Sequence, residues 1–295
     1  MVRPRGTLAL VAVTVLLAPA ILAQKAPPPG LPDLLRLGAE YAASYAPKIS
    51  GVTLEEQLML IEVSGTGMRT PIRVTSDVVL LNLNGRLMSL RDLFTVDGKA
   101  LRERTPRITE ALATPSAASW LAAQGYAREH AAHLLSNVVL WYSDPPQALE
   151  FIAPDNQKRL TYKLEGNKRL NGVQTMGVGY KETAIPNTNS IIGTPSSPLS
   201  SGRFYLDPAT GAIHQTELWI QSDSDTARVQ VVYAPDAKLG LLLPREASHT
   251  FEQREGGTGF NRAGSGGGTS RLRFESTAKY SNARHTPIDF GRIVR

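Results

Sequence analysis

Residues 272–280 read Leu-Arg-Phe-Glu-Ser-Thr-Ala-Lys-Tyr, and they alternate apolar or small residues with charged or polar ones. Successive side chains of a β-strand point to opposite faces of its sheet. A period of two therefore places one set of side chains in a core and the other set in water. This stretch predicts a strand in a sheet that is dry on one face and solvated on the other, as antiparallel sheets commonly are.

The same alternation recurs at three earlier places in the second half of the chain, at residues 159–164, 203–206 and 228–233. Residues 207–211, Asp-Pro-Ala-Thr-Gly, follow the second of these and are typical of a chain reversal. Beyond Gln147 we therefore expect β structure, with tight turns that join antiparallel neighbours.

The first half of the chain mixes helical and extended patterns. Residues 32–46 carry an apolar stripe typical of an amphipathic helix, which Pro47 is expected to end. Residues 52–63 and 69–83 indicate strands around a Gly-Thr-Gly turn, although the first of them alternates poorly and a helix stays an alternative there. Residues 87–96 indicate another strand. That strand ends at Asp97-Gly98, a strong turn signal.

Two more helical segments follow in this half. Residues 106–113 predict a short helix. Thr114-Pro115 has the form of an N-cap followed by proline at the first helical position, and the alanine-rich residues 116–135 predict the helix itself. Such helices are the available cover for the apolar side of the sheet.

The first residues have the composition of an export signal. Arg3 and Arg5 precede an apolar run at 8–17, and small residues follow. We expect residues 1–23 to be a signal peptide cleaved after Ala23, with Ala20 as the second choice. The run is shorter than the roughly 20 residues that span a bilayer, so a membrane anchor is the weaker interpretation.

The rest of the chain is expected to be a soluble exported protein. Cleavage would leave 272 of the 295 residues: a proline-rich spacer at 24–31 and a single α+β domain at 32–295, helix-containing to about 146 and β-rich beyond. With no cysteine, the domain has neither a disulfide nor a site for a lipid anchor. Loss of two arginines lowers the net charge from +6 to +4, and the basic residues are scattered, which disfavours a nucleic-acid partner.

Two stretches resemble linkers. Residues 185–201 are rich in Pro, Ser, Thr and Asn and predict a long mobile loop. Residues 256–270 are dense in glycine but lack the Gly-Lys-Ser/Thr of a phosphate-binding loop, so we interpret them as a flexible hairpin tip.

The sequence contains no recognisable catalytic motif. A cysteine nucleophile is excluded, and no Gly-x-Ser-x-Gly elbow is present. The one hydrolase arrangement left open is a distant serine beside His214 or His249. Carboxylates also lack the presentation of an acid–base couple, because Glu55 and Glu56, like Asp92 and Asp97, would point to opposite faces of a strand.

Metal and cofactor sites are not indicated either. His130 and His133 would share a helix face, but a transition metal needs more ligands, and His214, His249 and His285 are isolated in the sequence. We expect no metal and no cofactor. A polar helix face is the interpretation we prefer for the pair.

Five aromatic residues of the β-rich half are candidates for a ligand cavity: Phe204, Trp219, Tyr233, Phe251 and Phe274. Aromatic residues on strands more often form plain core, so both interpretations stay open. A sheet that curves around helices can leave an apolar pocket between the two layers.

Residues 91–104 read Arg-Asp-Leu-Phe-Thr-Val-Asp-Gly-Lys-Ala-Leu-Arg-Glu-Arg. They resemble an uncharacterised family of exported bacterial proteins that carries Phe-Arg-Asp-Val-Phe-Glu-Val-Asp-Gly followed by Val-Arg-Asp-Arg. Further matching passages lie at 73–81, 154–159, 202–211, 239–244 and 280–282. The chain departs from the family at 134–138, where the family has Tyr-Asn-Ile-Gly, and at Leu90, where it has an aromatic residue.

The family has no agreed activity, so this resemblance implies no reaction for the chain. Residues 203–211, followed by a strand, are also similar to periplasmic lipoprotein carriers of the lipoprotein-localisation type. In those proteins a curved antiparallel sheet wraps helices around a hydrophobic cavity. The resemblance thus implies an α+β fold with a curved, mostly antiparallel, half-barrel-like sheet that helices cover in part.

For the family motif itself we expect a structural role. Asp97-Gly98 forms a turn whose glycine can take a positive φ. Arg91 and Asp92 point to opposite faces, where they can pair with neighbouring strands or with Arg102 and Arg104.

These observations lead to three hypotheses. The first is a periplasmic or secreted binding protein that holds a lipid, a lipoprotein or an apolar protein segment in a cavity between sheet and helices. The second is an interaction or scaffold module with a filled core and an envelope protein as its partner. The third is an unrecognised hydrolase, although we lean away from an enzyme.

Overall fold

The computed structural model describes residues 29–64, 67–68, 70–83, 85–133, 144–183, 190–192, 199–221, 225–253 and 272–288. The predicted signal peptide, most of the spacer, the glycine-rich residues 256–270, the departure at 134–138 and part of the loop at 185–201 lie outside the described residues.

The strands form one sheet in which every neighbouring pair is antiparallel. They are β1 (Val52–Ser64), β2 (Gly67–Met68), β3 (Ile72–Leu83), β4 (Arg86–Val96), β5 (Lys99–Ala100), β6 (Leu160–Leu170), β7 (Val173–Glu182), β8 (Ser200–Leu206), β9 (Ile213–Gln221), β10 (Asp225–Asp236), β11 (Leu241–Gln253) and β12 (Leu272–His285). Their order is β5-β4-β3-β1-β12-β11-β10-β9-β8-β7-β6, with β2 beside β1. The last strand of the chain thus closes the gap between the two halves.

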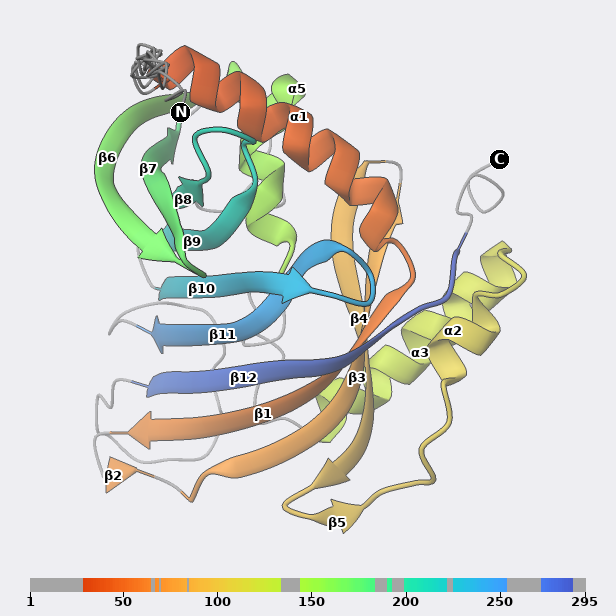
Figure 1. Cartoon of the computed structure of the whole chain (residues 1–295). Coiled ribbons are helices and arrows are strands. Elements are labelled where there is room, and N and C mark those ends of the chain that lie inside the picture. Colours follow the sequence, from red (N-terminus) through yellow and green to blue (C-terminus); the bar gives the residue numbers. More distant parts are fainter. Residues whose placement is uncertain are drawn as a thin grey trace, which may run out of the picture.

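The sheet curves strongly, and a long helix spans its two ends (Figure 1). α1 (Leu31–Ile49) contacts both β3 and β6, which lie near opposite ends of the strand order. Only a curved sheet brings both strands to one helix. The fold class expected from the sequence, a curved antiparallel sheet part-covered by helices, is confirmed.

The remaining helices cover two different faces. The 3₁₀ helix η1 (Gln147–Ile152) lies on the inner, concave side with α1, and the short α5 (Pro154–Gln157) follows it in contact with β6. By contrast, α2 (Arg107–Ala111) and α3 (Ala117–His133) pack outside β4. β3 accordingly buries side chains on both faces: Val78 and Leu80 join the inner core, and Val79 and Leu81 pack toward the outer helices. Of the described helices, none is both long and apolar enough to cross a membrane.

The alternation that defines the sheet is confirmed along β12. Phe274, Ala278 and Tyr280 are buried, while Arg273 and Lys279 between and beside them are exposed. The inner core is built around aromatic rings from several strands. In its centre the rings of Phe151, Tyr180 and Phe204 stack in a column, with centroid distances of 4.9 and 4.7 Å.

Helix boundaries differ from the expectations at two points. Pro47 does not end α1, which continues to Ile49. Pro47 is exposed, so the carbonyl that loses its helical partner can bond to water, while Ile49 is fully buried and holds the last turn in the core. Thr114 is not the cap of α3. Ser116 has that role, since the Ser116 and Ser119 hydroxyls each accept the other residue's backbone N–H at 3.1 and 2.8 Å.

The expectation of β structure directly beyond Gln147 is wrong for its first residues. Residues 147–157 form η1 and α5, and the first strand of this half begins at Leu160. Buried Leu149, Phe151 and Ile152 anchor η1 in the inner core. Leu164 is also not a core residue: it keeps 46% of its surface exposed, because β6 is an edge strand with a neighbour on one side only.

Candidate ligand-binding site

The inner wall of the sheet is apolar where β10, β11 and β12 run side by side. The register aligns Ala227 with Phe251 and Phe251 with Phe274, so their side chains form a row across three strands. The two phenyl rings lie 6.3 Å apart and are 8% and 4% exposed. This row is an apolar part of the wall in which two aromatic side chains lie side by side.

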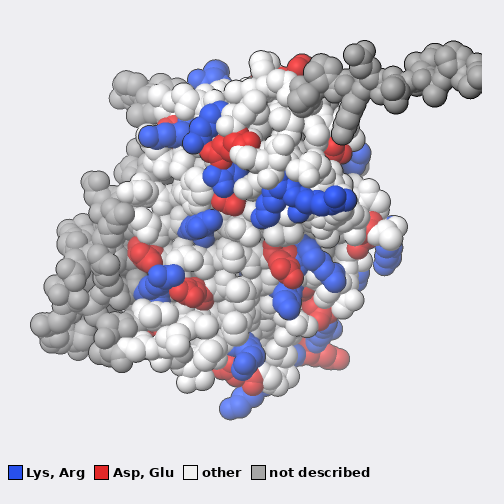
Figure 2. Space-filling view, turned by 60° about the vertical axis from the view of Figure 1, so that its left-hand side comes forward, with Lys and Arg blue, Asp and Glu red and all other residues white. Residues whose placement is uncertain are grey.

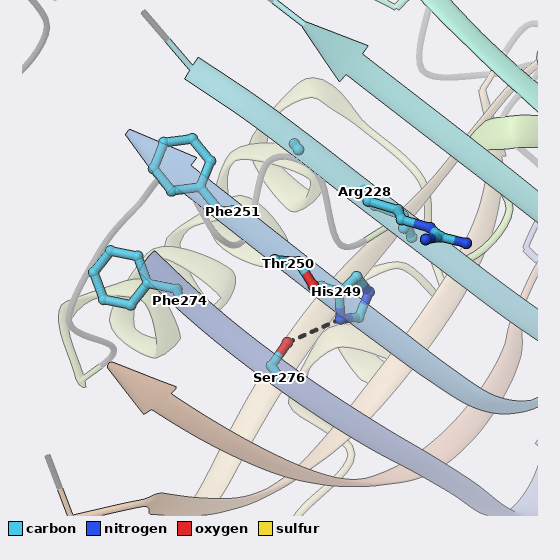
Figure 3. Close-up of a pocket in the computed structure, with 8 residues that line it drawn as sticks. Arg228, His249, Thr250, Phe251, Phe274 and Ser276 are labelled. Atoms are coloured by element: carbon cyan, nitrogen blue, oxygen red, sulfur yellow. Dashed lines mark hydrogen bonds between the residues drawn. The ribbon is translucent and has the colours of Figure 1, made fainter. Parts of the chain in front are cut away.

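A small pocket lies beside this row (Figure 3). Its lining includes Val229, His249, Phe251, Phe274 and Ser276, and its volume is about 10 Å³. That is space for about one water molecule. The inner wall at this place is therefore filled by its own side chains.

Two other aromatic candidates are part of the same inner core. Phe204 is fully buried and stacks on Tyr180. Tyr233 is buried and its hydroxyl donates a hydrogen bond to the carbonyl of Pro145 at 2.7 Å. The stacking on Tyr180 and the bond to Pro145 fix both rings in the core.

Trp219 faces the other side of the sheet. Its ring lies 5.6 Å from the Arg203 guanidinium and 5.7 Å from that of Arg228, whereas its neighbours Leu218 and Ile220 point into the inner core. The alternation of β9 puts the indole on the outer face. Of the five aromatic candidates, Trp219 thus lies apart from the other four.

The outer face carries charges of both signs in close pairs. Glu217 lies 3.8 Å from Arg203 and 3.5 Å from Arg228 across neighbouring strands. Figure 2 shows basic and acidic side chains interspersed over one face of the molecule. The Glu217 carboxylate is only 6% exposed, so the arginines cover it, and charges of the two signs are mixed on this face.

A buried ion pair lies among the apolar residues of the inner wall. Arg91 Nε lies 3.1 Å from Glu56 Oε2, with side chains only 7% and 1% exposed, and the Ser76 hydroxyl donates to the same carboxylate oxygen at 2.8 Å. Sequence reasoning placed Glu55 and Glu56 on opposite faces but did not select Glu56 as an inner residue. The pattern contained the signal, because Glu56 stands in an apolar position between Leu54 and Leu58.

His249 meets Ser276 on the inner wall, the pairing that the hydrolase hypothesis required. Nδ1 of His249 lies 2.9 Å from the Ser276 hydroxyl, and both side chains are buried. Burial, reinforced by the nearby Arg91 charge, lowers the pKa of His249 to about 4, so the imidazole is neutral at pH 7. Among the described residues Nε2 has no hydrogen-bond partner, so none of their carboxylates orients the ring, and the adjacent pocket holds only about one water molecule.

His214 and His285 have different hydrogen-bond partners. His214 Nδ1 is 3.3 Å from the Asn171 amide nitrogen, and burial lowers the pKa of His214. His285 Nε2 is 3.1 Å from the Ser50 carbonyl. The side chains of His130 and His133 are outside the described residues. Within the described ranges, no cluster of three metal-capable side chains occurs.

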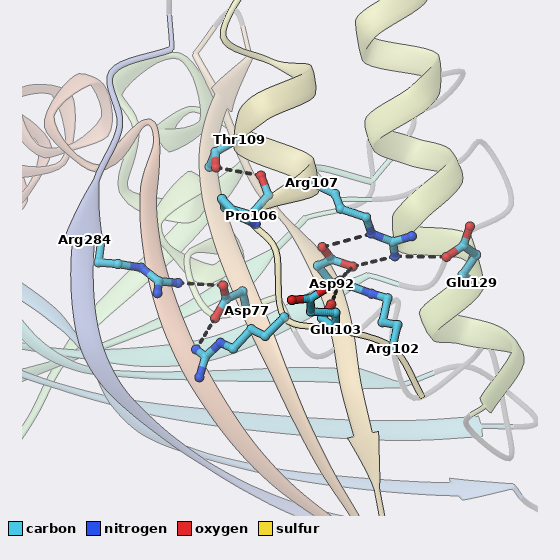
Figure 4. Close-up of polar contacts among 10 residues, drawn as sticks. Asp77, Asp92, Arg102, Glu103, Pro106, Arg107, Thr109, Glu129 and Arg284 are labelled. Carbon is cyan, nitrogen blue, oxygen red and sulfur yellow. Dashed lines mark hydrogen bonds and ion pairs between the residues drawn. The ribbon is translucent and has the colours of Figure 1, made fainter. Parts of the chain in front are cut away.

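The residues of the family motif lie mostly in an ion-pair network on the outer side of β3 and β4 (Figure 4). Asp92 pairs with Arg102 and, at 2.8 Å, with Arg107, which also bonds Glu129 of α3 at 2.9 Å. These contacts tie the connection after β5 to the sheet and to α3.

A second branch of the network joins three strands. Arg104 lies 2.8 Å from Glu55 and 2.7 Å from Asp77, and Arg284 of β12 lies 2.6 Å from Asp77. Arg104 therefore pairs with β1 and β3 and not with Asp92. Its guanidinium also lies 5.0 Å from the ring centroid of Phe94, as that of Arg102 does at 4.5 Å.

Asp97 and Gly98 form a turn in which both residues have a positive φ, 48° and 76°. The Asp97 carboxylate accepts the backbone N–H of Arg73 at 2.8 Å, which joins the turn to β3. The motif residues thus form ion pairs and hydrogen bonds with one another and with neighbouring strands. Such contacts hold a fold together.

Comparison with known proteins finds remote structural likenesses. No protein-family model matches the sequence, and no curated protein matches it. A putative outer membrane lipoprotein-sorting protein domain from Vibrio parahaemolyticus is 9% identical, with 85% of this chain and 91% of that chain covered and a TM-score of 0.38. A DUF1329 family protein from Desulfovibrio piger is 10% identical, with 86% and 93% covered and a TM-score of 0.36.

A LolA superfamily protein from Nitrosomonas europaea is 11% identical, with 85% of this chain and 94% of that chain covered and a TM-score of 0.30. These proteins include the class of lipoprotein carrier that the sequence resembles. At such identities and TM-scores the likenesses assign no function to this chain.

Proposed function

We propose that the protein is an exported binding protein of the bacterial envelope or its surroundings. It holds an apolar ligand, a lipid acyl chain or an apolar protein segment, against the inner wall of its curved sheet. The observation that carries this proposal is the apolar row of Ala227, Phe251 and Phe274 across β10, β11 and β12.

The main contacts of the described inner helices are with other strands than those of this row. α1 and η1 make their main contacts with β3, β4, β6 and β9, whereas the row belongs to β10–β12. The neighbouring pocket holds about one water, so an acyl chain needs the Phe251 and Phe274 rings to turn aside. Burial of the chain against the wall would supply about 0.8 kcal/mol for each CH₂ group.

Mass spectrometry of bound lipid tests the proposal. The full chain is expressed in a Gram-negative host, purified without detergent and extracted with organic solvent, and a fluorescent fatty acid is then titrated onto the extracted protein. We expect a co-purifying lipid and saturable probe binding. Phe274→Trp should lower the affinity for the fluorescent fatty acid, because the larger side chain narrows the pocket. Trp219→Phe, on the outer face, should leave this affinity unchanged. Protein that carries no lipid and binds no probe would refute the proposal.

A second candidate is an interaction module with a filled core. The pocket volume of only about 10 Å³ on the inner wall favours it. This module would bind no acyl probe, and crosslinking in cells would trap a specific protein partner.

A further inference from the structure

The sheet divides between β11 and β12. β10 and β11 remain paired as far as Asp236 and Leu241, and β1 and β12 as far as Val52 and His285. The pairing of β11 with β12, however, ends at Glu246 and Lys279. The segments 241–245 and 280–285 therefore each have a neighbouring strand on one side only, with Arg245, Asn282 and Ala283 in the register irregularities, and no described strand fills the space between the two segments.

Irregularities on both sides of the division explain why the strands separate. The β10–β11 ladder shifts register beside Tyr233, which pairs with Pro244, a residue without a backbone N–H. On the other side the β1–β12 ladder shifts between Thr53 and Glu55, and Asn282 adopts a positive φ of 52°. Bulges bend a strand and increase its twist, and here they do so at the same level of the sheet.

A cleft of about 310 Å³ occupies this division. Buried residues of the inner core, Leu54, Leu243 and Tyr280, line one part of it, and the exposed Arg245 and Asn282 line another. The cleft thus leads from the surface to the apolar interior between two strand edges. Its size lies within the range of ligand pockets.

Two side chains donate hydrogen bonds to backbone carbonyls of the two edges. Arg245 Nη1 reaches across to the Tyr280 carbonyl at 3.3 Å, and the Tyr45 hydroxyl of α1 donates to the Leu242 carbonyl at 2.7 Å. The bond from Arg245 is long and half exposed, so a ligand can displace it at little cost.

We propose that this cleft binds an extended peptide segment of a partner protein, which adds to the edges of β11 and β12. An extended peptide offers N–H and C=O groups to both edges, as in other cases of strand addition. An acyl chain would leave the same groups without hydrogen bonds, at a cost that peptide binding avoids. The alternation of side chains along such a segment would send apolar ones toward Leu54 and Leu243 and polar ones toward solvent.

This site is separate from the inner-wall row and its ligand is different, so the two proposals are independently testable. The probe is a display library of random peptides of about ten residues, selected on the full chain, with amide hydrogen exchange measured for the tightest peptide. We expect the peptide to slow exchange at those amides of residues 241–243 and 280–285 that point into the cleft, and to leave the amides of 247–251 unchanged. Exchange slowed elsewhere, or a library from which no peptide is enriched, would overturn the proposal.

Variants of β12 give a matched control. Ala283→Trp fills the cleft, whereas Thr277→Trp adds the same side chain at an exposed position of the fully paired part of the strand. Ala283→Trp should lower the affinity for the selected peptide about tenfold or more and leave fatty-acid binding and the circular dichroism spectrum unchanged. Thr277→Trp should leave all three unchanged.

If Ala283→Trp fails to fold, Ser281→Trp, which also lines the cleft, replaces it. Equal peptide affinity for the wild-type chain and a folded cleft variant would contradict the proposal. A peptide that competes with the fatty acid would also contradict it, since the ligand would then lie on the inner wall. Loss of fatty-acid binding alone would bear only on the proposed function.

Discussion

The Glu56–Arg91 pair places two charges inside an otherwise apolar wall. Removing two charges from water is costly, and their attraction repays this only when the remaining donors and acceptors are also bonded. Ser76 supplies part of that bonding to Glu56. The pair lies between the inner faces of β1 and β4, on either side of β3, and thereby links three strands.

Breaking this pair should be strongly destabilising. Arg91→Ala leaves the Glu56 carboxylate buried without its cation, and we expect the free energy of unfolding to fall by about 3–5 kcal/mol. Urea denaturation measures the change. Arg36→Ala, which breaks the exposed Arg36–Glu40 pair, should cost about 0.5 kcal/mol. A loss at Arg91 no greater than at Arg36 would show that the pair is not buried as described.

His249 should make stability depend on pH below neutrality. Its pKa is about 4 in the folded chain and near the ordinary 6.5 when unfolded, so between these values the unfolded state binds more protons. Stability should therefore fall as pH drops from 6.5 to 4, by at most about 3 kcal/mol. Denaturant titrations from pH 4 to 8 measure this slope. In His249→Gln the slope should flatten, and an unchanged slope would exclude His249 as its source.

Glu150 should have the opposite effect. Burial raises the pKa of the Glu150 carboxyl from its ordinary 4.5 to about 7, and Arg86 at 3.9 Å offsets this only in part. The folded state then binds more protons between these values, so stability is lost as pH rises from 4.5 through 7. Glu150→Gln should raise the unfolding free energy at pH 8 relative to pH 5. Equal effects of the substitution at both pH values would contradict this account.

At this scale the sequence predicted little of the site. Alternation places Phe274 on an apolar face, whereas Phe251 and Trp219 are candidates only as aromatic residues of the β-rich half, and residue type alone does not tell the face. The face of Trp219 depends on its register with Ser201 and Arg228 of the two neighbouring strands, which the residue type does not reveal. Glu56 was overlooked because a carboxylate in an apolar position has meaning only once Arg91 is known to lie beside it.

Among the elements, α1 depends on a close approach of the turn between β8 and β9. Gly211 has a φ of 71°, and a Cβ there would lie 2.3 Å from the backbone of Leu37. A side chain at this position is strained and also pushes on the backbone of the helix. The turn predicted at residues 207–211 therefore packs directly against the backbone of α1.

Gly211→Ala should loosen this contact. We expect a loss of about 2 kcal/mol or more, since the positive φ alone costs roughly 1–2 kcal/mol and the contact with α1 adds to it. Gly240→Ala is the matched control, because Gly240 has a similar φ of 66° but open space around its Cβ position. Thermal unfolding compares the two. Equal melting temperatures would mean that the turn does not press on α1.

Most elements were predictable from the sequence, because period-two alternation and turn residues act locally. β3, β4, β10 and β12 and the Asp97-Gly98 turn appear where the patterns indicated. The misassigned residues 147–157 show the limit, since an apolar run such as Ala-Leu-Glu-Phe-Ile fits a short helix as well as a strand. Which one forms depends on how the run packs under α1.

At the scale of the whole molecule, the two faces of the sheet differ in what covers them. The sheet wraps its apolar face around α1 and η1, and its outer face carries paired charges or, at β3 and β4, a second layer of helices. The strand order and the late insertion of β12 between β1 and β11 were not readable from the sequence. They depend on pairings between residues more than 200 positions apart, such as Glu56 with Tyr280.

Photoaffinity labelling with a diazirine fatty acid tests most directly whether the concave wall binds an apolar ligand. After irradiation of the full chain, peptide mass spectrometry should place the adducts on inner-face residues of β10–β12, with Phe251 and Phe274 among them, and unlabelled fatty acid should suppress them. Adducts confined to outer-face residues such as Trp219 and Arg228, or no saturable labelling at all, would contradict the account.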